Sequence, residues 1–303
     1  MRVLIAGVSG YIGRALCGSL LADAHEVVGL SRSPERTHAA QPGLLRVLRW
    51  APVIEPVPAE AFDGVDVVVH LAGEGVTGRW TAEKKRRLYD SRVESTRALV
   101  AGMAAATNRP RALVAGSAVG YYGERGDDQL AEPECAGTDF LARLTADWEE
   151  AASGAEGLGV RAARIRTGLI IGHESPFMRP MLPLFRLGLG GPIGSGRQWW
   201  PGVHLDDEVG LLRFAMEHAD SPSVLNATAP MPVRQREFAK ALGRVLRRPA
   251  LMPAPAFAVR ALLGEFSNEV LTSKRVLPSA ALAAGYTFRF TDVEAALRDV
   301  LTG

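Results

Sequence analysis

The sequence predicts an α/β fold of the doubly wound Rossmann type, followed by a smaller, mostly helical C-terminal lobe. Short apolar strands alternate with helical segments over the first 172 residues, a pattern typical of βαβ units and a parallel sheet. A glycine-rich turn follows the first strand directly, and residues 233–303 have the spacing of amphipathic helices. Together these observations indicate a nucleotide-binding sheet with a second lobe facing it.

The elements follow from the apolar pattern in chain order. Strands are expected at residues 2–6, 26–30, 65–71, 111–116, 160–171 (broken at Gly168) and 224–227. Helices are expected at 11–21, 81–106 and 138–152, and a strand and helix share residues 203–219. Right-handed crossovers then produce a doubly wound sheet. We predict a Rossmann domain from residues 1–172 and 203–230, and a substrate or cap lobe from 173–202 and 231–303.

Composition excludes several classes of protein. The 303 residues are 47% hydrophobic and 22% charged, as in ordinary globular proteins. The net charge of +2 gives no footprint for nucleic acid, and no apolar run approaches the roughly 18 residues that span a membrane. Neither nucleic acid nor a membrane is therefore expected as a partner. Two cysteines, and a first strand that starts at residue 2, favour a reducing, cytoplasmic location. No His or Cys spacing indicates a metal site, and the oligomeric state does not follow from the sequence.

The strongest motif is Gly7-x-x-Gly10-x-x-Gly13, between the first strand and the first helix. Glycine allows a tight turn and lets backbone N–H groups approach a pyrophosphate at the positive end of a helix. We therefore predict dinucleotide contacts from these three glycines and from Ser9, Tyr11 and Ile12. The alternative is a purely structural strand-to-helix turn.

The end of the second strand indicates which dinucleotide binds. An acidic residue usually stands there when a free ribose 2′-hydroxyl is bound, but this strand ends with Ser31 and Arg32. A guanidinium pairs well with a 2′-phosphate, to which a serine hydroxyl can also donate. These residues favour NADP(H) as the cofactor. A solvated loop arginine is the alternative.

Several further motifs extend the pattern over nearly the whole chain. They are His70-Leu71-Ala72-Gly73-Glu74, Asp90-Ser91-Arg92, Ser117-Ala118-Val119-Gly120-Tyr121-Tyr122-Gly123 and the glycine-rich stretch 185–196. With them the chain resembles the extended short-chain dehydrogenases/reductases, and most closely their atypical epimerase-family, sugar-epimerase-like subgroup. The resemblance implies an oxidoreductase or epimerase that acts on a small hydroxyl or carbonyl substrate. One departure is Pro201-Gly202-Val203-His204, where the subgroup usually has a Trp two residues before the His.

The resemblance also exposes a missing pair. The superfamily uses Asn, Ser and Tyr-x-x-x-Lys, in which Tyr transfers the proton and Lys lowers its pKa. Arg92 matches the Asn and Ser117 the Ser. Phe140 or Leu141 matches the Tyr, and Leu144 or Thr145 the Lys. None of these last four can carry out that proton transfer, so binding is better supported than catalysis.

Two segments near the carboxyl ends of the strands are further cofactor candidates. Leu71, Ala72 and Gly73 would let the nucleotide lie close to the backbone, and Glu74 would accept from a ribose or order its loop. Arg92 shares a helical stripe with apolar residues, and a buried guanidinium requires an anion. The anion would be a cofactor phosphate or, alternatively, Glu74.

For the proton source we predict Ser117, Tyr121 or Tyr122, with Arg92 stabilising a phenolate; packing aromatics are the alternative. Arg197, Gln198 and His204 are candidate substrate residues. The alternative there is a folded loop whose tryptophans plug the lobe interface, with Asp206 capping the next helix.

Two functions therefore compete. One is an NADP(H)-dependent oxidoreductase or epimerase acting on a small-molecule substrate. The other is a non-catalytic NADP(H)-sensing or partner-binding protein on the same scaffold, which the missing Tyr and Lys favour.

Overall fold

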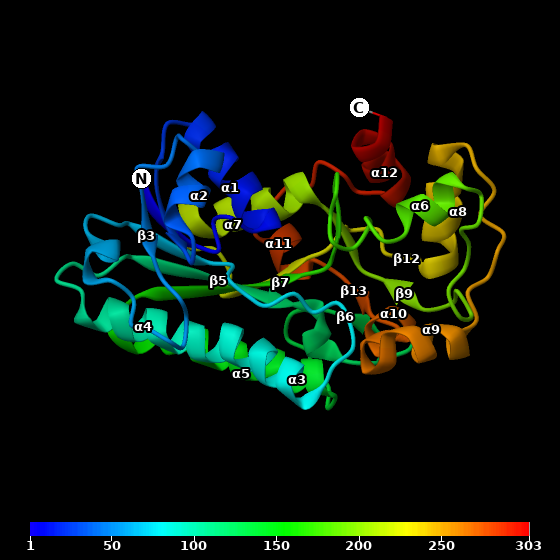
Figure 1. The fold of residues 1–303 in the computed structure, drawn as a ribbon, viewed down its shortest axis with the longest axis horizontal. Coiled ribbons are helices and arrows are strands. Elements are labelled where there is room, and N and C mark those ends of the chain that lie inside the picture. Colours follow the sequence, from blue (N-terminus) through cyan, green and yellow to red (C-terminus); the bar gives the residue numbers. More distant parts are fainter. Residues whose placement is uncertain (303) are drawn as a thin grey trace.

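The computed structural model describes residues 1–302, and its centre is a parallel sheet. Within this described part the sheet has seven strands in the order β11-β7-β5-β4-β1-β2-β3, all paired in parallel (Figure 1). Their bounds are β1 Arg2–Ala6, β2 Glu26–Ser31, β3 Arg46–Arg49, β4 Val67–His70, β5 Ala112–Ala118, β7 Arg161–Thr167 and β11 Val224–Ala227. The predicted doubly wound fold is confirmed.

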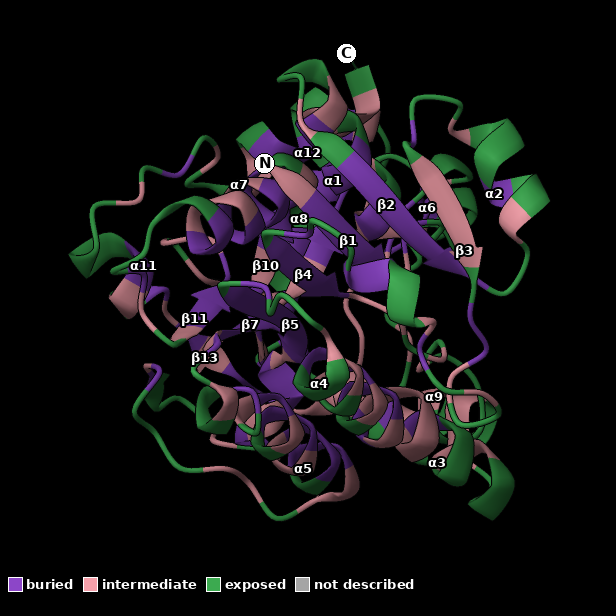
Figure 2. Ribbon diagram, turned by 90° about the vertical axis from the view of Figure 1, so that its left-hand side faces the viewer, coloured by how far each residue is buried: buried purple, intermediate pink, exposed green. Residues whose placement is uncertain are grey.

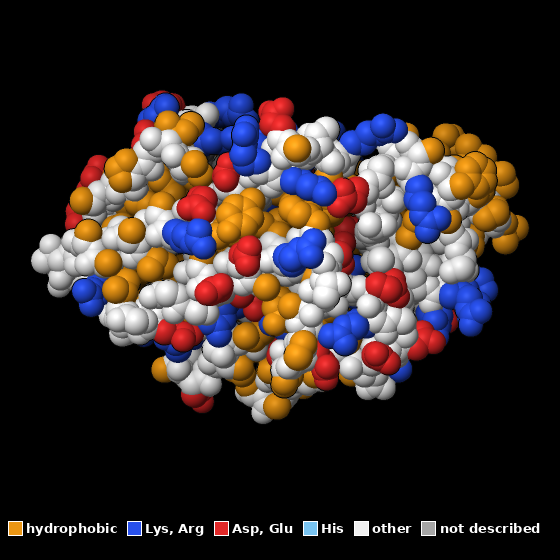
Figure 3. Space-filling model, turned by 90° about the horizontal axis from the view of Figure 1, so that it is seen from below, with side chains coloured by type: hydrophobic (Ala, Val, Ile, Leu, Met, Phe, Trp, Pro, Cys, Tyr) orange, Lys and Arg blue, Asp and Glu red, His pale blue; other side chains and the backbone are white. Residues whose placement is uncertain are grey.

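Helices cover both faces of this sheet. One face packs against α1 (Tyr11–Ala22) and α7 (Leu205–Glu217), and the other against α4 (Ser95–Ala105) and α5 (Phe140–Ser153). The central strands are buried on both sides (Figure 2), which explains why they are continuous apolar runs without alternation. Seen from the side of α3 to α5, the surface carries acidic and basic side chains interspersed (Figure 3).

The smaller lobe has its own apolar core, in which Phe177, Trp200 and Phe238 pack edge-on. The remaining helices are α2 Pro34–Ala40, α3 Ala82–Tyr89, α6 Leu182–Arg186, α8 Gln235–Leu246, α9 Ala256–Leu263, α10 Ser267–Leu271, α11 Ser279–Ala283 and α12 Val293–Thr302. Short strands are β6 Gln129–Leu130, β8 Leu169–Ile171, β9 Trp199–Trp200, β10 Gly202–His204, β12 Val233–Arg234 and β13 Arg275–Val276. Short 3₁₀ turns lie at 59–62, 119–122, 156–158 and 264–266. The C-terminal part is helical as predicted, and within residues 1–302 no helix has the length and apolarity to cross a bilayer.

The structure differs from the sequence prediction at three places. The edge strand β3 and the short helix α2 were not expected, because an edge strand pairs on one side only and needs no apolar run. The helix expected over 81–106 is divided by a π-helical turn, Asp90–Glu94. The assignment of segments to two domains stays a prediction.

The strand order determines where a ligand can bind. Because β1 lies between β2 and β4, the strand order reverses at β1. Such a topological switch point leaves a crevice outside the carboxyl ends of the strands. Residues 7–13 follow β1, and residues 71–74 follow β4. The fold therefore brings both predicted cofactor segments to this crevice.

Candidate functional site

The turn after β1 is shaped by two glycines in close contact with neighbouring backbone. Gly7 has φ +90°, and a Cβ there would lie 2.6 Å from the backbone N of Ala72. A Cβ on Gly13 would lie 2.2 Å from the carbonyl oxygen of Gly7. These contacts allow only glycine, and they hold the turn against the segment after β4.

The start of α1 can accept an anion. Its N-cap, Gly10, is exposed and supplies no side-chain cap, and in residues 1–302 no hydrogen bond is formed by the backbone N–H groups of Tyr11, Ile12 and Gly13. Unsatisfied N–H groups and the helix dipole favour a phosphate at this position. Ser9 is exposed beside them. The Tyr11 phenol points away and donates to the carbonyl oxygen of His173 at 2.8 Å.

The two residues that end β2 have different environments. The buried Ser31 hydroxyl lies 2.7 Å from the Thr37 hydroxyl and accepts from the backbone N–H of Ser33. These contacts hold the turn, and donation from Ser31 to a cofactor stays a prediction. Arg32 is exposed and has no acidic partner within the part of the chain that the structure describes.

Glu74 has protein partners. It receives Lys84 Nζ at 2.7 Å, and Arg87 Nε lies 3.7 Å away. The hydrogen bond from Lys84 lowers the pKa of this carboxyl. Its backbone N–H donates to the Ser91 hydroxyl. Of the two roles predicted for Glu74, ordering its loop is the one that these contacts favour.

Arg92 lies in the π-helical turn without a carboxylate partner. Its guanidinium lies 5.4 Å from the Trp148 ring centre and 3.4 Å from the position of a Cβ on Gly73, and it donates to the carbonyl oxygen of Leu88 at 3.3 Å. Burial lowers its pKa to about 10. No ion pair forms between Arg92 and any acid in residues 1–302, because Glu74 is taken by Lys84. Arg92 is therefore a half-buried, unpaired cation beside the segment that follows β4, as expected of a site that binds an anion.

Ser117 and Tyr122 belong to a buried network. The Ser117 hydroxyl donates to Glu149 Oε1 at 2.5 Å, and Arg166 donates to both oxygens of Glu149 at 2.8 Å. The Tyr122 hydroxyl donates to Asn226 Oδ1 at 2.8 Å and accepts from Arg166 at 2.8 Å. Both residues are at most 4% exposed, and burial raises the pKa of Tyr122 to about 12. These contacts favour a structural role for both residues, and their role toward a substrate stays a prediction.

Tyr121 is different, because it is only partly buried. The Arg166 guanidinium carbon lies 3.5 Å from its ring centre, and its ring meets that of Tyr122 edge-on at 5.4 Å. Its hydroxyl has no hydrogen-bond partner among the residues described. The cation beside the phenol is therefore Arg166 in place of the expected Arg92.

Two of the three predicted substrate residues have structural partners. The buried Gln198 donates to the carbonyl oxygens of Ile193 and Val270. The buried His204 caps α7, because its Nδ1 accepts from the backbone N–H of Asp206. The capping residue is thus His204, and Asp206 lies in the first turn. Arg197 is exposed.

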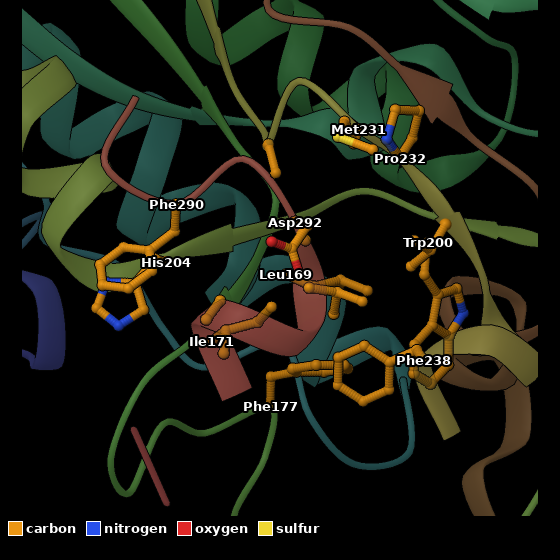
Figure 4. Close-up of a pocket in the computed structure, with 15 residues that line it drawn as sticks. Leu169, Ile171, Phe177, Trp200, His204, Met231, Pro232, Phe238, Phe290 and Asp292 are labelled. Atoms are coloured by element: carbon orange, nitrogen blue, oxygen red, sulfur yellow. The ribbon is translucent and has the colours of Figure 1, made fainter. Parts of the chain in front are cut away.

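His204 also borders an apolar hollow in the smaller lobe (Figure 4). Its cavity volume is only about 10 Å³, and all of its lining residues come from 169–296. Phe177, Trp200 and Phe238 line one end, and Phe290 stacks on His204 with ring centres 3.9 Å apart. The Asp292 carboxylate accepts from backbone N–H groups of α12. This hollow is part of the lobe core and includes no residue of the cofactor crevice.

Known proteins share the fold and much of the sequence of this chain. Residues 3–227 match the model of the NAD dependent epimerase/dehydratase family. The chain belongs to this family. Residues 254–300 match a domain of unknown function, DUF1731. Epimerase family protein ML0860 of Mycobacterium leprae is 40% identical over 297 residues, covering 97% of this chain and 94% of the relative.

Two solved structures show similarity along the chain. One is the human epimerase family protein SDR39U1 crystallised with NADPH, with TM-score 0.90 and 34% identity over the full length of both chains. The other is a nucleoside-diphosphate sugar epimerase of Corynebacterium glutamicum, with TM-score 0.78 and 34% identity over 99% of this chain and 58% of that one. The resemblance to atypical epimerase-family proteins is thereby confirmed.

Phe140 or Leu141, and Leu144 or Thr145, are the residues predicted to stand at the Tyr and Lys positions of the family, and Phe140 and Leu144 among them are packing residues. Phe140 meets the Trp80 ring at 5.4 Å, and Lys85 Nζ lies 4.9 Å from its ring centre. Leu144 is buried in the same small core. The start of α5 is thus an apolar contact with no group that transfers protons.

The structure also shows a charged pair, Lys274 and Glu269, that the sequence did not predict. The Lys274 side chain is 4% exposed, and its Nζ donates to the Thr272 hydroxyl at 2.7 Å and to Glu269 Oε2 at 3.3 Å. Glu269 Oε2 lies 3.9 Å from where a Cβ on Gly120 would stand. Only the packing of the smaller lobe against the turn after β5 reveals this pair, because its residues lie about 150 positions from Gly120 in the chain.

Proposed function

We propose that this protein binds NADP(H) and acts as an oxidoreductase or epimerase on a small hydroxyl or carbonyl compound. The observation that carries the proposal is the pair of anion-binding features at the crevice. One is the cation Arg92, which lies against Gly73 without an acidic partner in residues 1–302, and the other is the free N–H groups that begin α1. The NADPH-bound human relative supports the choice of cofactor. The unpaired cysteines, Cys17 and Cys135, suit the cytoplasm that we propose as its location.

The chain's own residues would share the binding. Backbone N–H groups of residues 11–13 would hold the pyrophosphate, and Arg32 would pair with the 2′-phosphate. The close approach of Gly7 to Ala72 leaves the crevice free for the nucleotide backbone. When bound, the nicotinamide supplies or accepts the hydride.

Tyr121 is the proton donor that the geometry favours. It is partly exposed on the turn after β5, with Arg166 against its ring, whereas the hydroxyls of Ser117 and Tyr122 are already bonded. Arg197, exposed on the glycine-rich loop, is the substrate-binding candidate that remains. Gln198 and His204 are not included, because the Gln198 amide holds the loop and His204 Nδ1 caps α7, while His204 Nε2 lies 3.3 Å from Asp299 Oδ2.

A non-catalytic sensor of NADP(H) is the second candidate. The packing of Phe140 and Leu144 favours it, because the usual proton transfer is absent from α5. Both candidates share cofactor binding and differ only in turnover.

The test separates the two steps. Calorimetric titration should give a lower Kd for NADPH than for NADH, and equal affinities would refute the cofactor assignment. NADPH absorbance is then followed with a panel of carbonyl compounds. Binding without oxidation on the whole panel favours the sensor. Where turnover is found, Tyr121→Phe should lower kcat with KM nearly unchanged, and an equal loss in the matched variant Tyr122→Phe would contradict the role of Tyr121.

A further inference from the structure

Large apolar side chains are exposed at one end of the smaller lobe. The exposed fractions are 72% for Leu187, 78% for Leu251 and 75% for Phe257, and Leu184, Leu189 and Met252 are each more than half exposed. None of the residues of α9 is buried. Hydrophobic side chains gather at this end in the space-filling view (Figure 3). Apolar patches of this kind mark contact sites.

Hydrogen bonds to backbone carbonyl groups join the segments that carry these side chains. The Met252 N–H donates to the carbonyl oxygen of Gly190 at 3.1 Å, and Arg248 Nε donates to that of Arg186 at 3.0 Å. Residues 184–193 and 247–254 therefore run side by side, and α9 follows directly. We call the six side chains of Leu184, Leu187, Leu189, Leu251, Met252 and Phe257 the apolar end surface.

Cations dominate the chain segments that carry the apolar end surface, although one of them, Arg244, is paired with Glu294 of α12. Segments 175–205 and 238–264 contain no Asp or Glu, and their cations are Arg179, Arg186, Arg197, Lys240, Arg244, Arg247, Arg248 and Arg260. The chain has a net charge of +2, so these eight cations leave −6 on the rest. Arg247, Arg248 and Lys240 border an open hollow of about 600 Å³ that Leu251 also lines.

Charge complementarity decides between occupants. In a symmetric dimer through this surface, the cations of one copy would face the same cations of the other, which is repulsive. A protein partner usually meets a polar rim around a pocket that buries its anchors, whereas these apolar side chains are exposed beside the cations Lys240, Arg247 and Arg248. Protruding apolar groups flanked by Lys and Arg are what an anionic lipid surface binds.

We propose that the apolar end surface docks the protein peripherally on an anionic lipid bilayer, with the arginines of residues 186, 247 and 248 at the headgroups. Each such cation contributes about fivefold to the partition coefficient at low salt. The sequence-based expectation of no membrane partner rested on the lack of a spanning segment, and a surface contact needs none.

The test is co-sedimentation of the full chain with vesicles of phosphatidylcholine, with and without phosphatidylglycerol. We expect binding to the anionic vesicles, weakened by salt and about tenfold or more stronger than to neutral ones. Arg247→Glu with Arg248→Glu should abolish it, and Leu187→Ser with Leu251→Ser should reduce it about tenfold or more. The matched controls are Arg86→Glu with Arg143→Glu, and Leu282→Ser, at exposed positions outside the surface. These controls should bind like the parent.

Three results would overturn the proposal. The first is no sedimentation of the parent with anionic vesicles. The second is equal loss in the control variants, which would indicate attraction by charge in general. The third is a dimer of the parent, detected by light scattering, that the Leu187→Ser, Leu251→Ser variant dissociates while vesicle binding is unchanged. Thermal unfolding of each variant confirms that the fold is intact.

Discussion

Replacing Glu149 by Gln tests whether the network around Ser117 and Tyr122 is structural. The Arg166 and Glu149 side chains are 3% and 10% exposed, and they share two hydrogen bonds of 2.8 Å. The substitution keeps the shape but leaves the guanidinium buried without a counter-charge, which typically costs about 3–5 kcal/mol. We expect urea unfolding to show a loss of this size in the free energy of unfolding. The matching fall in Tm is roughly 10 °C.

The control is an ion pair of the same chemistry in solvent. Glu83 pairs with Arg87, and their side chains are 68% and 48% exposed. Glu83→Gln should therefore lower the free energy of unfolding by less than about 0.5 kcal/mol. The NADPH affinity of folded Glu149→Gln protein should match that of the parent, because Glu149 contacts no residue of the crevice loops. A loss below about 1 kcal/mol, or a selective loss of NADPH binding, would refute the structural reading.

The other predictions concern the cofactor, the missing pair and pH. Arg32→Ala should weaken NADPH binding roughly 10- to 100-fold and NADH binding little, as calorimetry can measure; equal losses would contradict the 2′-phosphate role. Phe140→Ala and Leu144→Ala should each lower the free energy of unfolding by about 1–4 kcal/mol with NADPH affinity kept, and the reverse result would place them in the site. Burial raises the pKa of Glu208 from 4.5 to about 8, so the folded state holds a proton that the unfolded state loses. Stability should therefore fall as pH rises from about 5 to 8, and Glu208→Gln should flatten that slope in urea titrations; an unchanged slope would exclude Glu208 as its source.

Local patterns were sufficient for the sheet and for the phosphate turn. The strands are apolar because they are buried on both faces, and the glycines of residues 7 and 13 are required by backbone contacts that any strand-to-helix crossover of this kind makes. The apolar runs and the glycine spacing each span only a few neighbouring residues, so they can be predicted without tertiary information, although the contact of Gly7 with Ala72 appears only in the fold. The edge strand β3 has neither signal.

The site was less predictable because side-chain partners come from distant segments. The sequence places Ser117 at the end of a strand, but only the packing of α5 shows Glu149 accepting a hydrogen bond from its hydroxyl. In the same way, the sequence allowed Glu74 to pair with Arg92, but in the structure it pairs with Lys84 of α3. Residue type gave the chemistry at these positions, and the tertiary contacts decided which group meets which.

The π-helical turn between α3 and α4 has a consequence for insertions and deletions. An α-helix advances about 100° per residue, and a π turn holds one residue more than an α turn. Because that extra residue is taken up within one turn, α3 and α4 stay nearly in phase on either side of Asp90–Glu94. Deleting one residue there would join them into a regular helix and leave Leu88 and Leu99 facing their two core clusters. What would change is the turn itself, so such a deletion should displace Arg92 from the Gly73 segment while both cores stay packed.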